Sequence, residues 1–216
     1  MASSQYLEYH GEVHNNIPVD KVLRNYFPDF NYRGTFFDVG AFDPIVISNS
    51  YHFEKNGWDV YCFEANTDLI PKLKQFRKNV FHYAISDTDR DSVEFNIVYT
   101  MKDWSASFSS IDINPRYKNI FGWDKQWETK KIQVPQKTLN TVIQTEIVHH
   151  DKIDILSIDV EGGEMNVLKG LDISKYSPKI IVVENVGDDR DLDNYIRKFG
   201  YSLSLKSDYN HFYESH

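Results

Sequence analysis

The stretch that decides the fold is "TFFDVGAFDP", which runs from Thr35 to Pro44. Its first five residues suit a buried β-strand, because aromatic and β-branched side chains dominate them. The strand ends near an acid, Asp38. Gly40 then allows a tight turn in which the backbone can approach a bound molecule closely. A second acid follows at Asp43. This pattern predicts a core strand whose carboxyl end faces a ligand.

Working outward from this strand, the chain alternates between strand-like and helix-like segments. We predict strands over 34–39, 58–64, 80–86, 153–159, 179–185, 201–206 and 211–214, and helices over 18–27, 48–57, 67–79, 138–146, 161–171 and 189–200. Strands separated by helices indicate a parallel sheet with right-handed crossovers. The last two strands follow each other directly, so they should form an antiparallel hairpin at one edge. The prediction is an α/β fold with a mostly parallel seven-stranded sheet and helices on both faces.

The 216 residues fit a single domain, 1–216. We expect residues 1–33 to form an N-terminal arm. Residues 100–130 are aromatic and irregular, which predicts a loop insertion on the acceptor side of the site, either as a wall that stacks against sugars or as a lid.

Composition excludes several function classes. The formal net charge of −8 disfavours nucleic acid and anionic membrane surfaces as partners. The single cysteine, Cys62, cannot form an internal disulfide or a thiolate metal cluster. No apolar run is long enough for membrane insertion, and the first residues do not resemble a signal peptide, so we expect a cytoplasmic protein. The sequence leaves the oligomeric state open.

Acidic residues end the predicted core strands. They are Asp38, Glu64, Asp87, Asp159 and Glu184. In an open α/β sheet, ligands bind beyond the carboxyl ends of the strands. Each acid by itself suits a helix cap or a helix-dipole partner. Five like charges at one edge repel one another, however, unless a ligand or cation offsets them.

The turn after the first strand disfavours a pyrophosphate site and favours another cofactor. Glu64 lies 26 residues after Asp38, where an acid can accept hydrogen bonds from both ribose hydroxyls. A pyrophosphate, in contrast, needs free backbone N–H groups, and Asp43 and Pro44 offer a negative charge and a missing donor. Acids around the first turn suit a ligand with an amino group and a sulfonium. We therefore predict S-adenosyl-L-methionine (SAM) and not NAD.

The motifs resemble those of one family. "FFDVGAFDPIVISNSYHFEKNGWDVYCFEAN", "AISD", "TLN" and "IDILSIDVEGGEMNVLKGL" are similar to segments of the FkbM-like methyltransferases, a branch of the class I SAM-dependent enzymes with a Rossmann-like fold. The resemblance covers about residues 34 to 205, and its most specific part runs from Ile153 to Leu171. Two positions depart from the family pattern, Asn140 in "TLN" and the turn Phe42–Pro44.

The resemblance implies a set of cofactor-binding residues. Asp38 and Gly40, with Phe42 and Asp43 beside them, would hold the methionine portion. Ser48, Asn49 and Tyr51 would lie near the cofactor where the next helix begins. Glu64, followed by Asn66, would bind the ribose, and Ala84, Ser86 and Asp87 would flank the adenine. Asp159 and Glu161, in the family's "DVEG" element, would lie beside the transferred methyl group. The implied activity is O-methylation, and we expect the acceptor to be a sugar hydroxyl on a glycan or a small glycosylated product. An NAD-dependent oxidoreductase and a non-catalytic binding module are the alternatives.

A sugar hydroxyl is a poor acid, so its attack on a methyl group needs a base, a metal ion or both. Asp159, Glu184 and Asn185 offer three oxygen ligands, which suit Mg²⁺ or Mn²⁺ and resemble the metal site of catechol-type O-methyltransferases. Glu161 or His150 would then take the proton. The alternative is that Asp159 acts alone as the base.

Overall fold

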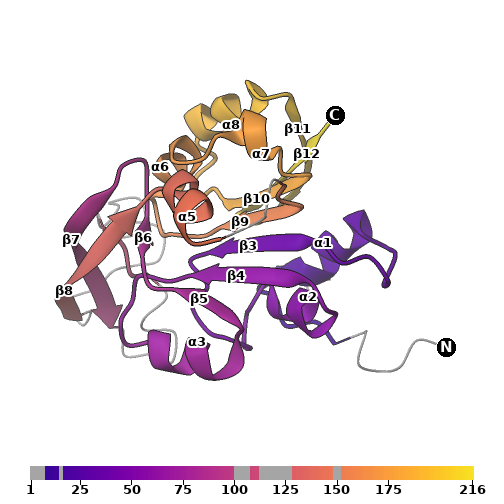
Figure 1. Ribbon diagram of the computed structural model, residues 1–216. Coiled ribbons are helices and arrows are strands. Elements are labelled where there is room, and N and C mark those ends of the chain that lie inside the picture. Colours follow the sequence, from indigo (N-terminus) through magenta and orange to yellow (C-terminus); the bar gives the residue numbers. More distant parts are fainter. Residues whose placement is uncertain (1–7, 15–16, 100–107, 112–127, 148–151) are drawn as a thin grey trace.

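The computed structural model describes residues 8–14, 17–99, 108–111, 128–147 and 152–216. In these residues the largest sheet has seven strands in the order β11-β12-β10-β9-β3-β4-β5 (Figure 1). They are β3 (Thr35–Val39), β4 (Asp59–Phe63), β5 (Asn79–Phe81), β9 (Ile155–Ile158), β10 (Ile180–Glu184), β11 (Tyr201–Ser207) and β12 (Asn210–Ser215). The five strands β10, β9, β3, β4 and β5 are parallel to one another. Strand β12 runs antiparallel to its neighbours β10 and β11. The predicted α/β fold with a mostly parallel sheet is confirmed.

Helices lie against the seven-stranded sheet in two hydrophobic clusters. They are α1 (Val19–Tyr26), α2 (Tyr51–Lys55), α3 (Ile70–Phe76), α5 (Leu139–Thr145), α6 (Glu164–Lys169), α7 (Ile173–Tyr176) and α8 (Arg190–Arg197). Successive side chains of a strand point to opposite faces. Phe36 of β3 accordingly packs in one cluster with Leu23 of α1 and Phe53 of α2, whereas Phe37 packs in the other with Val142 of α5 and Leu168 of α6. Strand β3 is therefore buried on both faces, which explains its apolar sequence.

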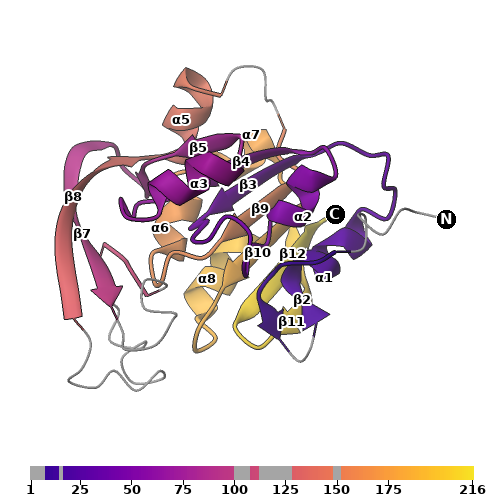
Figure 2. The same cartoon turned by 90° about the horizontal axis from the view of Figure 1, so that it is seen from below.

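A second sheet of three strands lies beside the first. It contains β6 (Ala84–Ile85), β7 (Arg90–Tyr99) and β8 (Glu128–Lys137) in the order β6-β8-β7. Figures 1 and 2 show it at one side of the molecule, across from α1. The predicted single strand over 80–86 is wrong in this respect, since the chain leaves the main sheet after β5 and enters the second sheet with β6. In the segment that joins β5 to β6, the His82 ring lies 3.1 Å from the carbonyl oxygen of Ala65.

The N-terminal segment crosses the carboxyl ends of the strands. Its short strands β1 (Val13–His14) and β2 (Ile17–Pro18) pair with each other. The backbone N–H of His10 donates to Asp20 at 2.6 Å, and that of Glu12 donates to the Asn49 side chain at 3.2 Å. Buried polar contacts therefore fix this part of the arm in place. None of the helices in the described ranges has the length and apolar composition needed to cross a membrane.

Candidate active site

Two adjacent cavities open at the carboxyl ends of β3, β4, β9 and β10. The first cavity has a volume of about 220 Å³ and is bordered by Glu64, the segment 83–87 and the second sheet. The other, which we call the acidic cavity, has a volume of about 410 Å³ and is bordered by the ends of β3, β9 and β10 and by the N-terminal segment. They share four lining residues, Gly40, Phe42, Asp159 and Glu161. A ligand that extended through both cavities would lie against these four residues.

Gly40 brings the ends of β3 and β9 together. Its φ angle is +88°, and a Cβ atom at this position would lie 1.7 Å from the backbone oxygen of Asp159. Only glycine fits such a close approach of two backbones. The glycine seen in the sequence therefore serves contact between neighbouring strands as well as room for a ligand.

Glu64 lies at the end of β4 and is 7% exposed. Its two carboxylate oxygens accept hydrogen bonds from the backbone N–H groups of Phe42, at 2.9 Å, and Asn66, at 2.7 Å. Burial raises the pKa of this carboxyl, while those backbone donors oppose the shift. Because each carboxylate oxygen accepts more than one hydrogen bond, Glu64 keeps acceptor capacity toward the first cavity. This arrangement suits a ligand that presents hydroxyl groups.

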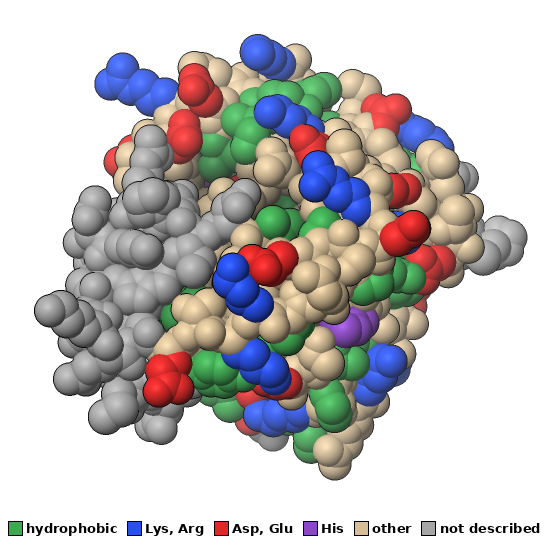
Figure 3. Space-filling model, turned by 90° about the vertical axis from the view of Figure 1, so that its left-hand side faces the viewer, with side chains coloured by type: hydrophobic (Ala, Val, Ile, Leu, Met, Phe, Trp, Pro, Cys, Tyr) green, Lys and Arg blue, Asp and Glu red, His purple; other side chains and the backbone are tan. Residues whose placement is uncertain are grey.

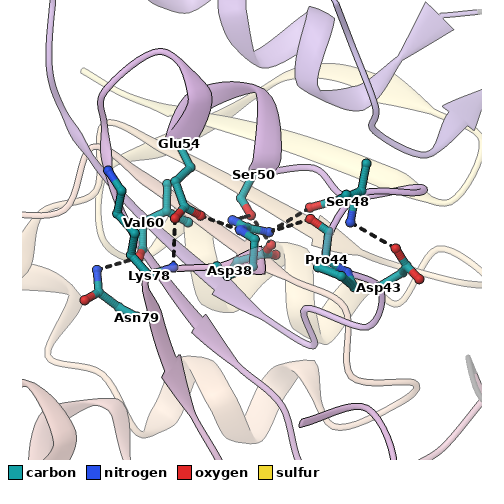
Figure 4. A network of polar contacts seen from close by, with 11 residues as sticks. Asp38, Asp43, Pro44, Ser48, Ser50, Glu54, Val60, Lys78 and Asn79 are labelled. Carbon is teal, nitrogen blue, oxygen red and sulfur yellow. Dashed lines mark hydrogen bonds and ion pairs between the residues drawn. The ribbon is translucent and has the colours of Figure 1, made fainter. Parts of the chain in front are cut away.

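Asp38, at the end of β3, belongs to a buried network centred on Arg77. The Asp38 carboxylate accepts a hydrogen bond from the Ser50 hydroxyl. Arg77, only 4% exposed, donates to Ser50 at 2.7 Å and to Ser48 at 3.1 Å, and it pairs with Glu54. Figure 4 shows labelled members of this network from three places: Asp38 on β3, Glu54 on α2, and Ser48 and Ser50 in the turn before α2.

This network corrects the predicted start of a helix at Ser48 or Asn49. The helix begins at Tyr51, and Ser50 at its N-cap makes no side-chain capping bond. Its hydroxyl donates instead to Asp38. The predicted cap residue Ser48 accepts a hydrogen bond from Arg77 at 3.1 Å. Burial raises the pKa of Asp38, and the charge of Arg77 opposes this shift.

Asp159 and Glu161 lie at the end of β9, in the wall that the two cavities share. Burial and the nearby Glu184 raise the pKa of both carboxyls well above their ordinary values. Glu161 has a positive φ of 60°, an unfavourable conformation for a residue with a side chain. The Glu164 side chain holds this loop by accepting from the N–H of Gly162 at 2.8 Å and, more weakly, from that of Val160 at 3.3 Å. Two protonatable groups therefore lie in the wall that the two cavities share.

The structure brings most of the predicted site residues to these cavities. Besides the four shared residues, Glu64, Ala84, Ser86 and Asp87 line the first cavity, and Asp38, Ser48, Asn49 and Glu184 line the acidic cavity. The roles of these residues stay predictions. His150 lies outside the described residues.

Four of the predicted site residues do not line either cavity. Their side chains contact neighbouring parts of the chain instead. Asp43 accepts from the N–H groups of Ile45 and Val46, both at 2.9 Å, and so holds its own turn. Asn66 accepts from the N–H of Asp68 at 3.0 Å. Tyr51 lies beside Arg77, whose guanidinium carbon is 5.7 Å from the ring centre. Asn185 is the fourth residue.

Asn185 matters most because it was predicted as a metal ligand. Its side-chain oxygen accepts from the N–H of Asp189 at 2.7 Å, and its amide nitrogen donates to the Asp189 carbonyl at 3.2 Å. Both ends of the amide therefore hold the loop before α8. Among the residues that the structure describes, no group of three His, Cys, Asp or Glu side chains is arranged to hold a metal ion. The predicted metal site of Asp159, Glu184 and Asn185 has no support.

Some cavity residues were not predicted. Tyr83, Phe95 and Arg90 line the first cavity, and Glu12 and Tyr209 line the acidic one. Glu12 precedes the first core strand and Tyr209 lies in the final hairpin, so strand-end reasoning does not reach them. The alternating pattern of 92–100 predicts an exposed strand and gives no sign that Phe95 faces a cavity.

The outer surface next to the second sheet carries both charges. On the described part of the face in Figure 3, Lys and Arg side chains lie among Asp and Glu, with hydrophobic side chains between them. The second sheet carries an exposed pair of opposite charges, Lys131 of β8 with Glu94 of β7, 2.7 Å apart. This part of the surface therefore offers no uniformly basic patch.

Comparison with known proteins assigns the family. The model of the methyltransferase FkbM domain matches residues 38–203, well over half of the chain. The chain therefore belongs to the FkbM methyltransferase family, as the sequence motifs indicated. Searches of curated proteins and of solved structures found no match.

Proposed function

We propose that this protein transfers a methyl group from SAM to a hydroxyl group of a sugar, on a glycan or a glycosylated product. The observation that carries the proposal is the position of Asp159 and Glu161, in the wall between a cavity that contains Glu64 and a second, acidic cavity. A cofactor in one cavity and an acceptor in the other would meet at these two carboxyls. The FkbM domain supports the transferred group.

The residues of the first cavity fit SAM. Glu64 would accept hydrogen bonds from the ribose hydroxyls, and the segment 84–87 would border the adenine, with Asp87 accepting from its amino group. SAM, when bound, supplies a methyl group on a positively charged sulfur. That charge would lie near Asp159 and Glu161, whose pKa values are raised, and would favour their ionised forms.

Asp159 then acts as the general base. A carboxyl with a raised pKa is suited to proton transfer near neutral pH. The acceptor oxygen forms a bond to the methyl carbon as the carbon–sulfur bond breaks, and the bonding electron pair stays on sulfur. The hydroxyl proton goes to Asp159. Glu161, beside it, shares the negative charge and can carry the proton onward to solvent.

Two other functions were considered from the sequence. An NAD-dependent oxidoreductase is disfavoured by the turn after β3, where the Asp43 carboxylate occupies the backbone N–H groups of Ile45 and Val46. Those groups would otherwise be available to a pyrophosphate. A non-catalytic module with the cofactor fold would bind a partner and transfer no methyl group, so a measurement of turnover distinguishes it from the proposed enzyme.

The test combines calorimetry with a methyl-transfer screen. We expect SAM and S-adenosylhomocysteine to bind and NAD not to bind, and a panel of oligosaccharides to contain a methylated acceptor. Glu64→Gln should weaken SAM at least about tenfold, because charge-assisted hydrogen bonds contribute about 1.5–3 kcal/mol each. Asp159→Asn should lower kcat at least about a hundredfold, the lower range for a general base.

The controls separate the alternatives. Glu94→Gln also replaces a carboxylate by an amide, but on the exposed surface, and should alter neither the affinity for SAM nor kcat. NAD binding without SAM binding would contradict the proposal, and SAM binding without turnover on any glycan would favour the binding module. Assays with EDTA and with added Mg²⁺ measure any metal requirement, and full activity of Asp159→Asn would contradict the assigned base.

A further inference from the structure

The N-terminal arm borders only one of the two cavities. Glu12 and Val13 line the acidic cavity, whereas no described residue before Val39 lines the first cavity. Both arm residues also precede the matched FkbM domain, which begins at residue 38. The arm therefore lies on the side of the site where the proposed acceptor would bind, and the cavity that contains Glu64 is formed without it.

Two side chains of the core clamp the arm through its backbone. The N–H of His10 donates to the Asp20 carboxylate at 2.6 Å. The N–H of Glu12 donates to the side-chain oxygen of Asn49 at 3.2 Å. Because Asn49 also lines the acidic cavity, the second bond joins the arm directly to the opposite part of the cavity wall.

Gly11 lies between these two bonds and leaves no room for a side chain. It pairs with Ile47 in a parallel β-bridge. A Cβ atom at this position would lie 2.7 Å from the backbone nitrogen of Asp20 and 3.0 Å from the side-chain oxygen of Asn49. Interiors are packed too closely to absorb such contacts, so even a methyl group here would push the arm away from the core.

Asp20 shows that the clamp is built into the core. This residue lies in the first turn of α1 and is 0% exposed. An acid at that position could serve the helix alone. Its carboxylate, however, accepts from the N–H of Lys21 at 2.9 Å and from the N–H of His10 at 2.6 Å, so one donor comes from the helix and one from the arm. Burying a carboxylate is costly without such donors, and the arm supplies one of them.

We propose that the arm from His10 to Val13 is a fixed wall that selects the acceptor, and that Val13 sets the size of acceptor that the acidic cavity admits. This inference rests on the proposed methyl transfer and assigns acceptor selection to a segment outside the family domain. The Val13 side chain lines the cavity and is 58% exposed, so it lies at the edge of the cavity toward solvent. A larger side chain there narrows the entrance without disturbing the core.

A substitution at Val13 tests the size selection. The acceptors are the methyl glycosides of glucose, galactose and mannose, compared with disaccharides that contain the same sugars. Val13→Phe should lower kcat/KM for the disaccharides about tenfold more than for the methyl glycosides, the lower end of the discrimination that a methylene-sized misfit produces.

Ile17→Phe is the matched control. Ile17 is also exposed, at 48%, and it lines neither cavity. It precedes Pro18, the residue that pairs with Val13, so the side chains of Ile17 and Val13 point to opposite faces of the hairpin. This variant should keep the acceptor preference of the parent.

Gly11→Ala tests the clamp. It should displace the arm and speed amide hydrogen exchange at His10 and Glu12, whose N–H groups make the two clamping bonds. It should raise KM at least about tenfold for every acceptor and leave kcat within about threefold, because contacts made equally in the ground state and the transition state affect KM alone. The affinity for S-adenosylhomocysteine, measured by calorimetry, should not change, since the first cavity contains no arm residue.

An unchanged acceptor preference in Val13→Phe, or an unchanged KM in Gly11→Ala, overturns the inference. Loss of S-adenosylhomocysteine binding in either variant also overturns it, because the arm would then belong to the cofactor site. The proposed function fails in a different way. In that case the parent protein itself transfers no methyl group from SAM to any sugar of the panel, and the inference falls with it.

Discussion

The ends of β3 and β9 lie side by side, and each carries an acid, but the two acids have opposite surroundings. Asp38 accepts from Ser50 and has the buried Arg77 behind it. The charged groups around Asp159 are mainly other carboxyls, and among them Glu184 raises its pKa most. The comparison shows that the ionisation of an acid at a strand end depends on the charges around it. Asp38 is part of a buried network that contains a cation, whereas Asp159 lies among carboxyls that disfavour its ionised form.

The largest expected effect tests the Asp38 side of this comparison. Arg77→Leu should lower the free energy of unfolding by about 3–5 kcal/mol, because it leaves Glu54 and Asp38 as buried charges without a cation. Urea denaturation measures the change. Lys72→Leu is the control, since it removes the more exposed pair with Asp43 and should cost at most about 1 kcal/mol. Equal effects of the two variants would mean that the Arg77 network is not what stabilises this edge.

A paired substitution tests the comparison directly. In the protein without ligand at pH 7, Asp38→Asn should destabilise by about 1.5 kcal/mol, because it weakens a charged hydrogen bond and the attraction to Arg77. Asp159→Asn should leave stability unchanged or raise it by about 1 kcal/mol, because burial and Glu184 disfavour the ionised form of this carboxyl and Asn is neutral at every pH. Thermal unfolding of both variants beside the parent measures the signs. The same sign for both would remove the distinction between the two acids.

The smallest expected effect is a pH dependence. Burial raises the pKa of Asp159 and Glu161 in the folded state, so the folded protein binds more protons than the unfolded chain above about pH 4. Their contribution to stability is full below the unfolded pKa values and is lost as pH rises through the folded ones. Asp20, whose pKa burial raises to about 6, contributes with the same sign.

Denaturation series from pH 4 to pH 8 measure this slope. Glu161→Gln should flatten it, by at most about 1.4 kcal/mol per pH unit for the single proton removed. Glu94→Gln, on the exposed surface, should leave the slope unchanged. A slope of opposite sign in the parent would show that these carboxyls are ionised in the folded state without a ligand.

Several features of the fold and the site were predictable because they depend on neighbours in sequence. The run of apolar residues over β3 predicts a strand buried on both faces, and two consecutive strands after α8 predict the antiparallel hairpin at the sheet edge. The parallel order then brings Asp38, Glu64 and Asp159 to one edge, since the carboxyl ends of parallel strands meet there. The motifs of residues 34–205 were also enough to indicate the FkbM family.

What the sequence by itself determined is therefore the class of fold, the edge of the sheet and the acids that reach it. Only the tertiary structure decided what each acid meets there. Arg77 lies 39 residues from Asp38 in sequence, and Glu12 lies on an arm that precedes every core strand, so no local pattern links them to the site. The charge environment of a carboxyl depends on distances through space, and burial in a low-dielectric interior strengthens each of these interactions. For this reason the sequence located the acids, while the fold placed Asp38 beside a buried cation and Asp159 and Glu161 among other carboxyls.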